Sequence, residues 1–317
     1  MTTYIAADIG GTNIRTARYT ANGELLQRAR HRTPTDSSGD AVIEQLADAI
    51  REVLPHHDGV KAIAISAPGP IDPFTGIVFR AANVPSWVNF PLKDKVESIF
   101  KLPVAVGNDA NLAAMGEWKF GAGRGHNDLL FLTISTGIGG GAIVGGRLLV
   151  GAHGLAAELG HITISPDGPV CGCGRRGHLE ALASGPAIGR AARRRLYAGA
   201  KSKVYDLVNG KIEDVTAQHV GEAAALGDEF AINQLAEAGT YIGRALADFL
   251  HFSNPSIVII GGGVAINVGD FLFEPMRRAM KERLMDEHYA CEIVPAQLGD
   301  DVGLLGTLAL AAEMYPA

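Results

Sequence analysis

Residues 4–12 read Tyr4-Ile5-Ala6-Ala7-Asp8-Ile9-Gly10-Gly11-Thr12, an apolar run typical of a buried strand that leads into a glycine loop. The alternating residues 15–19 and the turn signal Asn22-Gly23 then predict a hairpin. The same plan recurs over residues 129–150, where an apolar run precedes a second glycine loop and a turn at Gly145-Gly146. Two copies of strand, loop and hairpin indicate a duplicated α/β domain.

The remaining predicted elements alternate between strands and helices. We expect strands at 60–65, 104–106 and 257–260, and helices at 40–54, 110–120, 230–252 and 302–314. This alternation predicts an α/β fold with largely parallel sheets, which bind ligands at the carboxyl ends of their strands. We predict a smaller N-terminal domain over residues 1–120 and a larger domain over 121–301, with the helix in 302–317 packing back on the first.

Composition and charge disfavour several classes of protein. The 317 residues carry a net charge of −6, which disfavours dedicated nucleic-acid binding, and the three cysteines do not make a disulfide framework. One basic cluster, Arg190 with residues 193–195, is typical of an exposed helix face. The first residues lack the features of a signal peptide, and the apolar stretches are too broken by glycine to span a bilayer. We expect a cytoplasmic protein without a nucleic-acid or membrane partner.

Glycine is in surplus, with 40 residues, about twice its usual share of ~7%. Three clusters follow predicted strands: Gly10-Gly11, residues 137–141 and residues 261–263. Glycine lets backbone N–H groups approach an anion, although any one cluster is equally typical of a tight turn. Three clusters, two of them in matching units, favour a bound nucleotide.

A dinucleotide-binding dehydrogenase is the alternative for the second loop. Gly137-x-Gly139-x-x-Ala142 matches the Rossmann pattern, and Glu158 follows near the ~20-residue distance of a ribose-binding acid. That pattern needs a helix directly after the loop. Residues 142–149 are typical of a hairpin instead, which disfavours the dehydrogenase.

Asn108-Asp109 stands between a predicted strand and a predicted helix. An aspartate here is typical of a helix N-cap, and it is also a candidate carboxylate base. The local sequence favours the cap, with the base as the alternative.

Residues 158–180 combine thiols and imidazoles at close spacing. His161, Cys171, Cys173 and His178 suit a tetrahedral structural Zn²⁺. The alternative is a glycine-rich loop without a metal, in which these polar residues are incidental.

Taken in order, these motifs resemble the ROK family (repressors, uncharacterised reading frames and sugar kinases), above all its glucokinase branch. The resemblance covers nearly the whole chain. The matching motifs are Asp8-x-Gly10-Gly11-Thr12-x-x-Arg15, Asn83-Val84-Pro85-Ser86-Trp87, Asn108-Asp109, Thr136-Gly137-x-Gly139-Gly140-Gly141, Glu158-x-Gly160-His161, Cys171-x-Cys173-Gly174-x-x-Gly177-His178-x-Glu180, Ala181-Leu182-Ala183-Ser184-Gly185 and Gly261-Gly262-Gly263.

The resemblance implies the actin-like, ribonuclease-H-like ATPase fold, with two α/β domains and a ligand cleft between them. It implies an ATP-dependent hexokinase that uses Mg²⁺ with ATP, phosphorylates the 6-hydroxyl of a hexose and holds a structural Zn²⁺. Glucose is the favoured hexose, with mannose, fructose and N-acetylhexosamines as alternatives, and the donor could be ATP, ADP or polyphosphate. A homodimer or homotetramer is expected.

The resemblance also implies roles for single residues. Asp109 would be the general base and a sugar contact. The other sugar contacts would be Asn83, Asn108, Glu158, His161 and Glu180. The nucleotide contacts would be Asp8, Gly10, Gly11, Thr12, Asn13, Arg15, Thr136, Gly137, Gly139, Gly140, Gly261, Gly262 and Gly263.

The chain departs from the family at one position. The family usually has a third cysteine where this chain has His178, so a metal site here would be of the Cys₂His₂ type. A sugar-sensing regulator is the alternative from another class. Such regulators carry a DNA-binding domain before the kinase-like part, whereas here the first strand already ends at Asp8.

Overall fold

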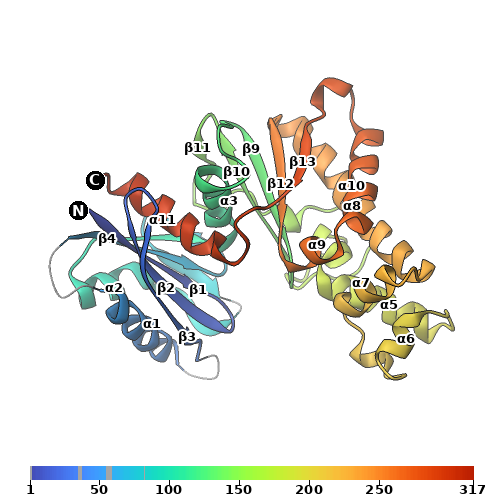
Figure 1. The fold of residues 1–317 in the computed structure, drawn as a ribbon, viewed down its shortest axis with the longest axis horizontal. Helices are drawn as coiled ribbons and strands as arrows, with labels where there is room; N and C mark the ends of the chain where they lie inside the picture. Colours follow the sequence, from blue (N-terminus) through green and yellow to red (C-terminus); the bar gives the residue numbers. More distant parts are fainter. Residues whose placement is uncertain (1, 35–37, 55–58, 82) are drawn as a thin grey trace. The chain divides into compact units, whose positions relative to one another are not determined.

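A computed structural model describes residues 2–34, 38–54, 59–81 and 83–317 (Figure 1). Its strands are β1 (Thr3–Ile9), β2 (Asn13–Thr20), β3 (Leu25–Arg32), β4 (Val60–Ala67), β5 (Ile71–Asp72), β6 (Ile77–Ala81), β7 (Val84–Pro91), β8 (Val104–Asn108), β9 (Leu129–Ile134), β10 (Ile138–Val144), β11 (Arg147–Leu148), β12 (Ile257–Gly261) and β13 (Glu292–Pro295). Its helices are α1 (Gly39–Val53), α2 (Leu92–Phe100), α3 (Asp109–Phe120), α4 (Leu179–Ala183), α5 (Gly185–Tyr197), α6 (Lys203–Leu207), α7 (Ala217–Ala225), α8 (Glu229–Ser253), α9 (Gly263–Val268), α10 (Asp270–Arg283) and α11 (Val302–Met314).

Two five-stranded sheets repeat one strand order. The first runs β3-β2-β1-β4-β8 and the second runs β11-β10-β9-β12-β13. In each sheet the strand that begins the repeat (β1 or β9) is parallel to the strand beside it (β4 or β12), and the outer hairpin is antiparallel. The two orders correspond strand for strand, which confirms the predicted duplication and the α/β class. A third sheet, β5-β6-β7, was not predicted.

Contacts within the chain group it into two compact units. The first unit comprises Met1–Gly125, Gly141–Ala157 and Gln297–Ala317, and the second comprises His126–Gly140 and Glu158–Ala296. The chain therefore passes between the units at four places, one of which lies within β10. None of the described helices is long and apolar enough to cross a membrane.

The sheet of the first unit is covered by helices on both faces. Side chains of β1 alternate, so that Ile5 belongs to the core cluster that includes α1 and α2, whereas Tyr4 belongs to the cluster that includes Leu304 and Leu308 of α11. The apolar stripe predicted for residues 40–54 forms α1, whose first turn is capped by Ser38. This core holds the carboxyl ends of β1, β4 and β8 at one edge of the sheet.

In the second unit, the buried strand β12 lies between β9 and β13. Helix α8 begins at the cap Asp228, which accepts a hydrogen bond from the amide of Ala231 (2.8 Å). It packs closely on α10, because Gly239 and Gly243 leave room for the carbonyls of Leu272 and Met276. These helices and α4–α7 form the scaffold on which the residues of the second unit discussed below are held.

Candidate functional site

The first glycine loop joins β1 to β2. The amide of Gly10 donates to the carbonyl of Asn13 (2.9 Å), and Thr33 Oγ1 donates to the carbonyl of Gly10 (2.7 Å). Gly11 and Thr12 are exposed at the tip. An exposed, tightly closed turn of this kind can present backbone N–H groups to an anion.

Asp8 and Arg15 face one another across the β1–β2 hairpin. Arg15 Nη2 and Nε both donate to Asp8 Oδ2, at 2.5 and 3.2 Å, and Arg15 Nη1 donates to the carbonyl of Asp300 (2.6 Å). The structure shows no hydrogen bond to Asp8 Oδ1 from any residue that it describes. Arg15 therefore positions the carboxylate by one oxygen and leaves the other available.

Asn83 lies against the tip of the first loop. A Cβ atom at Gly11 would come within 2.9 Å of Asn83 Nδ2. Glycine at position 11 thus makes room for this amide. The structure brings a predicted sugar contact and a predicted phosphate contact together.

Asn108 and Asp109 mark the junction of β8 and α3. Asn108 is the N-cap of α3: its Oδ1 accepts from the amides of Ala110 and Asn111 (3.0 and 3.2 Å), and its Nδ2 donates to the carbonyl of Gly69 (3.0 Å). Asp109 is exposed in the first helical turn, where its Oδ1 accepts from the amide of Ala110 (2.9 Å). The N-cap role considered for Asp109 therefore belongs to the preceding asparagine.

The register of the first sheet brings Asp8 and Asn108 to one edge. Asp8 pairs with Ser66 on β4, and Ser66 pairs with Gly107 on β8. Ser66 is fully buried, and its Oγ has no hydrogen-bond partner among the described residues. Sequence reasoning missed Ser66, although its place at the end of a predicted strand was a usable signal.

The second glycine loop joins β9 to β10 and is followed by a hairpin. Gly145 and Gly146 both have positive φ (55° and 71°), as a two-residue hairpin turn requires. The helix that a Rossmann site needs is therefore not formed after this loop. This finding excludes the dehydrogenase alternative.

A pocket of about 880 Å³, here called the loop pocket, connects the second glycine loop with the third glycine cluster. Thr136 and Gly263 both line it. The other lining residues, which sequence reasoning missed, come from the end of β9 and from α5, α7, α9 and the residues before them: Ser135, Gly185, Pro186, Gly189, Arg193, Thr216, Ala217, Gln218, Gly221, Glu222, Ala225, Val264, Asn267 and Val268. The sequence signal that could have indicated this pocket is the pair Gly185 and Gly189, which lie one helical turn apart on the same helix face.

Several of the predicted glycines have packing reasons of their own. A Cβ atom at Gly261 would meet Phe131, one at Gly262 (φ 90°) would meet Ile134, and one at Gly140 would meet Leu159. Of the cluster 261–263, only Gly263 lines the loop pocket. The glycines that sequence reasoning grouped together therefore divide into core positions and pocket positions.

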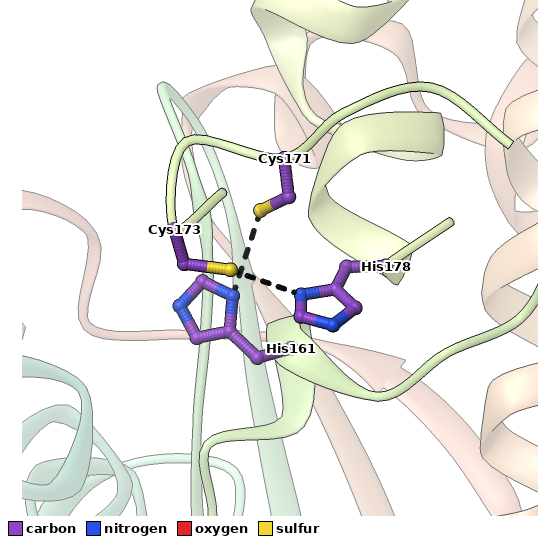
Figure 2. A group of neighbouring side chains, drawn as sticks. All are labelled: His161, Cys171, Cys173 and His178. Atoms are coloured by element: carbon purple, nitrogen blue, oxygen red, sulfur yellow. Dashed lines mark hydrogen bonds between the residues drawn. The ribbon is translucent and has the colours of Figure 1, made fainter. Parts of the chain in front are cut away.

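The structure gathers His161, Cys171, Cys173 and His178 into one cluster, with their ligand atoms within 4.8 Å of one another (Figure 2). Cys171 Sγ lies 3.6 Å from His161 Nδ1, and Cys173 Sγ lies 3.3 Å from His178 Nδ1. Cys171 and His178 are buried, His161 is half-buried and Cys173 is exposed. No other group of three or more such side chains with metal-binding spacing occurs in the described part of the chain.

Local hydrogen bonds shape the loop that presents the two thiols. The amide of Cys171 donates to the carbonyl of Arg175 (2.7 Å), and the amide of Gly174 donates to the carbonyl of Cys171 (2.9 Å). Gly174 and Gly177 have positive φ (87° and 69°), which is why glycine occurs at both. The turn points both sulfur atoms toward the imidazoles (Figure 2).

The pKa of the Cys171 thiol is raised to about 11, chiefly by burial; a backbone hydrogen bond from Cys173 opposes this rise, and the side chains of Cys173 and Glu180 add to it. A divalent cation favours the thiolate strongly and would reverse this effect. The four side chains, two thiols and two imidazoles, are a donor set that Zn²⁺ prefers.

Glu180, in the first turn of α4, joins this cluster to the second glycine loop. Its Oε2 accepts from the amide of Ile138 (3.1 Å), and its Oε1 accepts from the thiol of Cys171 (3.4 Å). Glu158 precedes a 3₁₀ turn (Leu159–His161) that ends at His161, and the amide of His161 donates to the carbonyl of Glu158 (3.0 Å). Of these three predicted sugar contacts, His161 belongs to the cluster, Glu180 is hydrogen-bonded to it through Cys171, and Glu158 precedes His161 by one short turn.

Comparison with known proteins places the chain among sugar kinases. The sequence profile of the ROK family matches residues 4–314. A glucokinase of Thermotoga maritima is 39% identical over 312 residues, covering 98% of this chain and 97% of the relative. An N-acetylmannosamine kinase of Shigella flexneri is 31% identical over 309 residues, with 98% of both chains covered.

A solved structure gives the same assignment. The ROK family glucokinase from Streptomyces griseus, crystallised in complex with glucose and AMPPNP, superposes with a TM-score of 0.83 at 37% identity and covers 98% of this chain and 99% of its own. This similarity confirms the expected actin-like α/β fold. With its profile matched almost from end to end, the chain belongs to the ROK family.

Proposed function

We propose that the protein is an ATP-dependent hexokinase that transfers the γ-phosphoryl group of ATP to the 6-hydroxyl of glucose. The observation that carries this proposal is the loop pocket, in which Thr136 and Gly263 line one cavity of a size suited to a small ligand such as a nucleotide. Full-length similarity to glucokinases supports glucose as the sugar. The lower identity to an N-acetylmannosamine kinase leaves that sugar as the alternative to be tested.

Phosphoryl transfer requires bound phosphates, neutralised charge and an oriented nucleophile. The first loop (residues 10–13) and the second loop (residues 136–140) would bind the phosphates of ATP. Mg²⁺ prefers oxygen ligands and keeps much of its water shell, and Asp8 Oδ1 fits this chemistry because Arg15 engages only Oδ2. When bound, Mg²⁺ supplies charge neutralisation to the phosphates.

Asp109 would be the general base. It would accept the proton of the sugar 6-hydroxyl as that oxygen attacks the γ-phosphorus. Asn108 supports this role because it satisfies the first amides of α3. Its Nδ2 bond to the carbonyl of Gly69 leaves one amide hydrogen for a sugar hydroxyl.

The sugar would be recognised by Glu158, His161 and Glu180 in the second unit and by Asn83 in the first. His161 turns Nδ1 toward Cys171. Its Nε2 has no hydrogen-bond partner among the described residues and would bind a hydroxyl. A sugar lacking the matching hydroxyl leaves such groups unpaired, which is the physical basis of discrimination.

Zn²⁺ would be held by His161, Cys171, Cys173 and His178. Its chemistry there is structural: it would hold the loop that carries Cys171 beside Glu180. The presence of two imidazoles and two thiols within 4.8 Å supports this assignment.

A panel of sugars and donors tests the proposal. Glucose, mannose, fructose and N-acetylmannosamine are each assayed with ATP, ADP and polyphosphate, and formation of the phosphorylated sugar is measured. We expect the highest kcat/KM for glucose with ATP. A higher value for N-acetylmannosamine would contradict glucose, and no turnover with any pair would contradict the kinase.

Assembly and location complete the proposal. We expect a homodimer or homotetramer, seen in light scattering as two or four times the chain mass of 33.2 kDa. We expect the cytoplasm as the location, because the three cysteines are free and two of them lie in the proposed metal cluster.

A further inference from the structure

Three of the four arginines in the basic cluster of residues 190 and 193–195 line a second cavity. This cavity, about 480 Å³ and here called the arginine pocket, is lined by Arg190, Arg193 and Arg194 of α5. Helix α5 also contributes Ala187 and Ala191. The other walls come from α4, α8 and the segment before Cys171, and comprise Ser165, Gly168, Pro169, Ala181, Leu182, Glu237 and Tyr241. All of these residues lie in the second unit.

The arginine pocket is positively charged, and its guanidinium groups are only partly paired with acceptors. The guanidinium of Arg194 has no hydrogen-bond or ion-pair partner among the described residues. Arg190 uses one nitrogen, Nη2, which donates to the carbonyl of Ala181 (3.3 Å). Glu237, the acidic residue of the lining, is paired with Arg195, whose Nη1 lies 2.8 Å from Glu237 Oε2. A basic concavity on a chain of net charge −6 concentrates anions locally.

Helix α5 separates the arginine pocket from the loop pocket. Gly185, Gly189 and Arg193, spaced by four residues, line the loop pocket, whereas Arg190 and Arg194 line the arginine pocket. Arg193 lines both. The arginine pocket is therefore a separate site, and substitution of Arg190 and Arg194 leaves the lining of the loop pocket unchanged.

We propose that the arginine pocket binds a phosphomonoester of a small organic molecule. Arginine presents a planar set of donors that matches phosphate oxygens. The pocket is much larger than a phosphate ion, and Pro169, Leu182 and Ala191 add apolar surface while Tyr241 adds a ring and a hydroxyl. These features fit an organic body attached to the phosphate. No acidic group in the lining remains unpaired to repel it.

Calorimetric titration of the full-length protein tests the proposal without sugar or nucleotide turnover. The probes are ribose 5-phosphate, inorganic phosphate and uncharged ribose, at constant ionic strength. The test variant is Arg190→Ala/Arg194→Ala. The matched control is Arg278→Ala, which removes an exposed arginine of α10 outside both pockets. Alanine favours the helix at both positions of the test variant, so folding is expected to be retained.

We expect ribose 5-phosphate to bind at one saturable site in the wild type and to bind more tightly than inorganic phosphate. We expect at least tenfold weaker binding in the double variant and unchanged binding in Arg278→Ala. Unchanged binding in the double variant would overturn the proposal, and equal affinity for inorganic phosphate would contradict an organic ligand. A smaller assembly mass of the double variant would show instead that these arginines form a subunit contact. None of these outcomes bears on the kinase activity, which is assayed separately.

Discussion

Asn108 and Asp109 share a junction at which the local sequence favours Asp109 as the helix cap. The structure assigns the cap to Asn108, whose Oδ1 accepts from two helix amides, and leaves Asp109 exposed in the first turn. Because Asn108 provides the cap, the Asp109 carboxylate can act as a base. Neighbouring residues of the third glycine cluster also differ in role: Gly263 lines the loop pocket, whereas Gly262 packs against Ile134.

Asp109→Asn removes the proposed base and keeps its shape. We expect kcat to fall by about 10²–10⁴, the usual contribution of general base catalysis, with the affinity for glucose nearly unchanged. Coupled detection of ADP gives kcat, and titration with glucose gives Kd. Asp94→Asn, an exposed aspartate in the first turn of α2, is the control and should keep full activity. Retention of wild-type kcat by Asp109→Asn would rule out Asp109 as the base.

His178 stands where the family usually has a cysteine, and the structure places its Nδ1 3.3 Å from Cys173 Sγ. We expect about one zinc ion per chain in freshly purified protein, since structural zinc takes four ligands. His178→Ala should lower that content, and His178→Cys should restore it. Mass spectrometry of the metal gives the ratio.

Cys291→Ser is the control for the metal measurement. Cys291 lies outside the cluster, and burial raises the pKa of its thiol to about 11. This variant should keep its zinc. Wild-type protein without zinc would contradict the metal site, and full zinc content in His178→Ala would remove His178 from the ligand set.

At the scale of elements, hydrogen bonds at helix ends and close glycine contacts hold the scaffold. Asp228 caps α8 through the amide of Ala231 and also accepts from the amide of Lys203 (2.7 Å) and from Ser202 Oγ (2.9 Å) at the start of α6. Helices α3 and α11 pack closely because Gly116 and Gly306 carry no side chain. Single residues therefore determine where these helices begin and how closely they approach.

Asp228→Ala should lower the free energy of unfolding by about 1–3 kcal/mol at pH 7, because two helix ends lose their acceptor. Burial opposes ionisation of Asp228, but hydrogen bonds from Lys203 and Ala231 outweigh it and hold its pKa below the ordinary value of 3.8. A depressed folded-state pKa gives stability that is present above the unfolded-state value and is lost as pH falls through the folded-state value.

The difference between wild type and Asp228→Ala should therefore narrow as the pH falls below 3.8. Urea denaturation at pH 7 and at lower pH measures it. Asp206→Ala, at an exposed position of α6, is the matched control and should change little. A difference that widens in acid would contradict the assigned cause.

At the scale of the whole molecule, Glu117 of α3 accepts hydrogen bonds from the two segments at which the chain leaves and re-enters the first unit. Its Oε2 accepts from the amide of Ala122 (2.9 Å), just before the passage at Gly125, and its Oε1 accepts from the amides of Gln297 and Leu298 (2.9 Å each), just after the passage at Ala296. The side chain is fully buried. One carboxylate is thus hydrogen-bonded to two segments that are about 180 residues apart in the chain.

Glu117→Gln replaces one acceptor oxygen by an amide donor. At least one buried N–H then loses its acceptor, which should cost about 1–3 kcal/mol of unfolding free energy. Thermal and urea denaturation measure the loss. Glu313→Gln, an exposed glutamate of α11, should leave stability unchanged. If Glu117→Gln were as stable as Glu313→Gln, the three hydrogen bonds of Glu117 would make no net contribution to the free energy of unfolding.

Much of the fold could be predicted from the order of residues. The strand–loop–hairpin repeats became β1–β3 and β9–β11, and the helix expected at 302–314 became α11 with the same limits. These elements carry strong periodic patterns and clear turn residues, which act locally. The sheet β5-β6-β7, the strand β13 and the helices α2, α4, α6, α7, α9 and α10 were missed. Most of these are short segments, which have weak patterns and owe their conformation to packing. Helix α10 is longer, but it contains Pro275, a residue that predicts a helix end.

The sequence by itself determined the duplicated α/β plan, the three glycine clusters and the set of thiols and imidazoles, because each depends on residue type and on short spacing. Only the tertiary structure assigned the cap to Asn108 and brought Thr136 and Gly263 to one pocket. It also tied Ala122 to Gln297 through Glu117 and placed Arg190 and Arg194 on a cavity. The physical reason is range: propensity and turn chemistry act over a few residues, whereas pockets and buried hydrogen bonds join segments that the chain separates by tens to hundreds of residues.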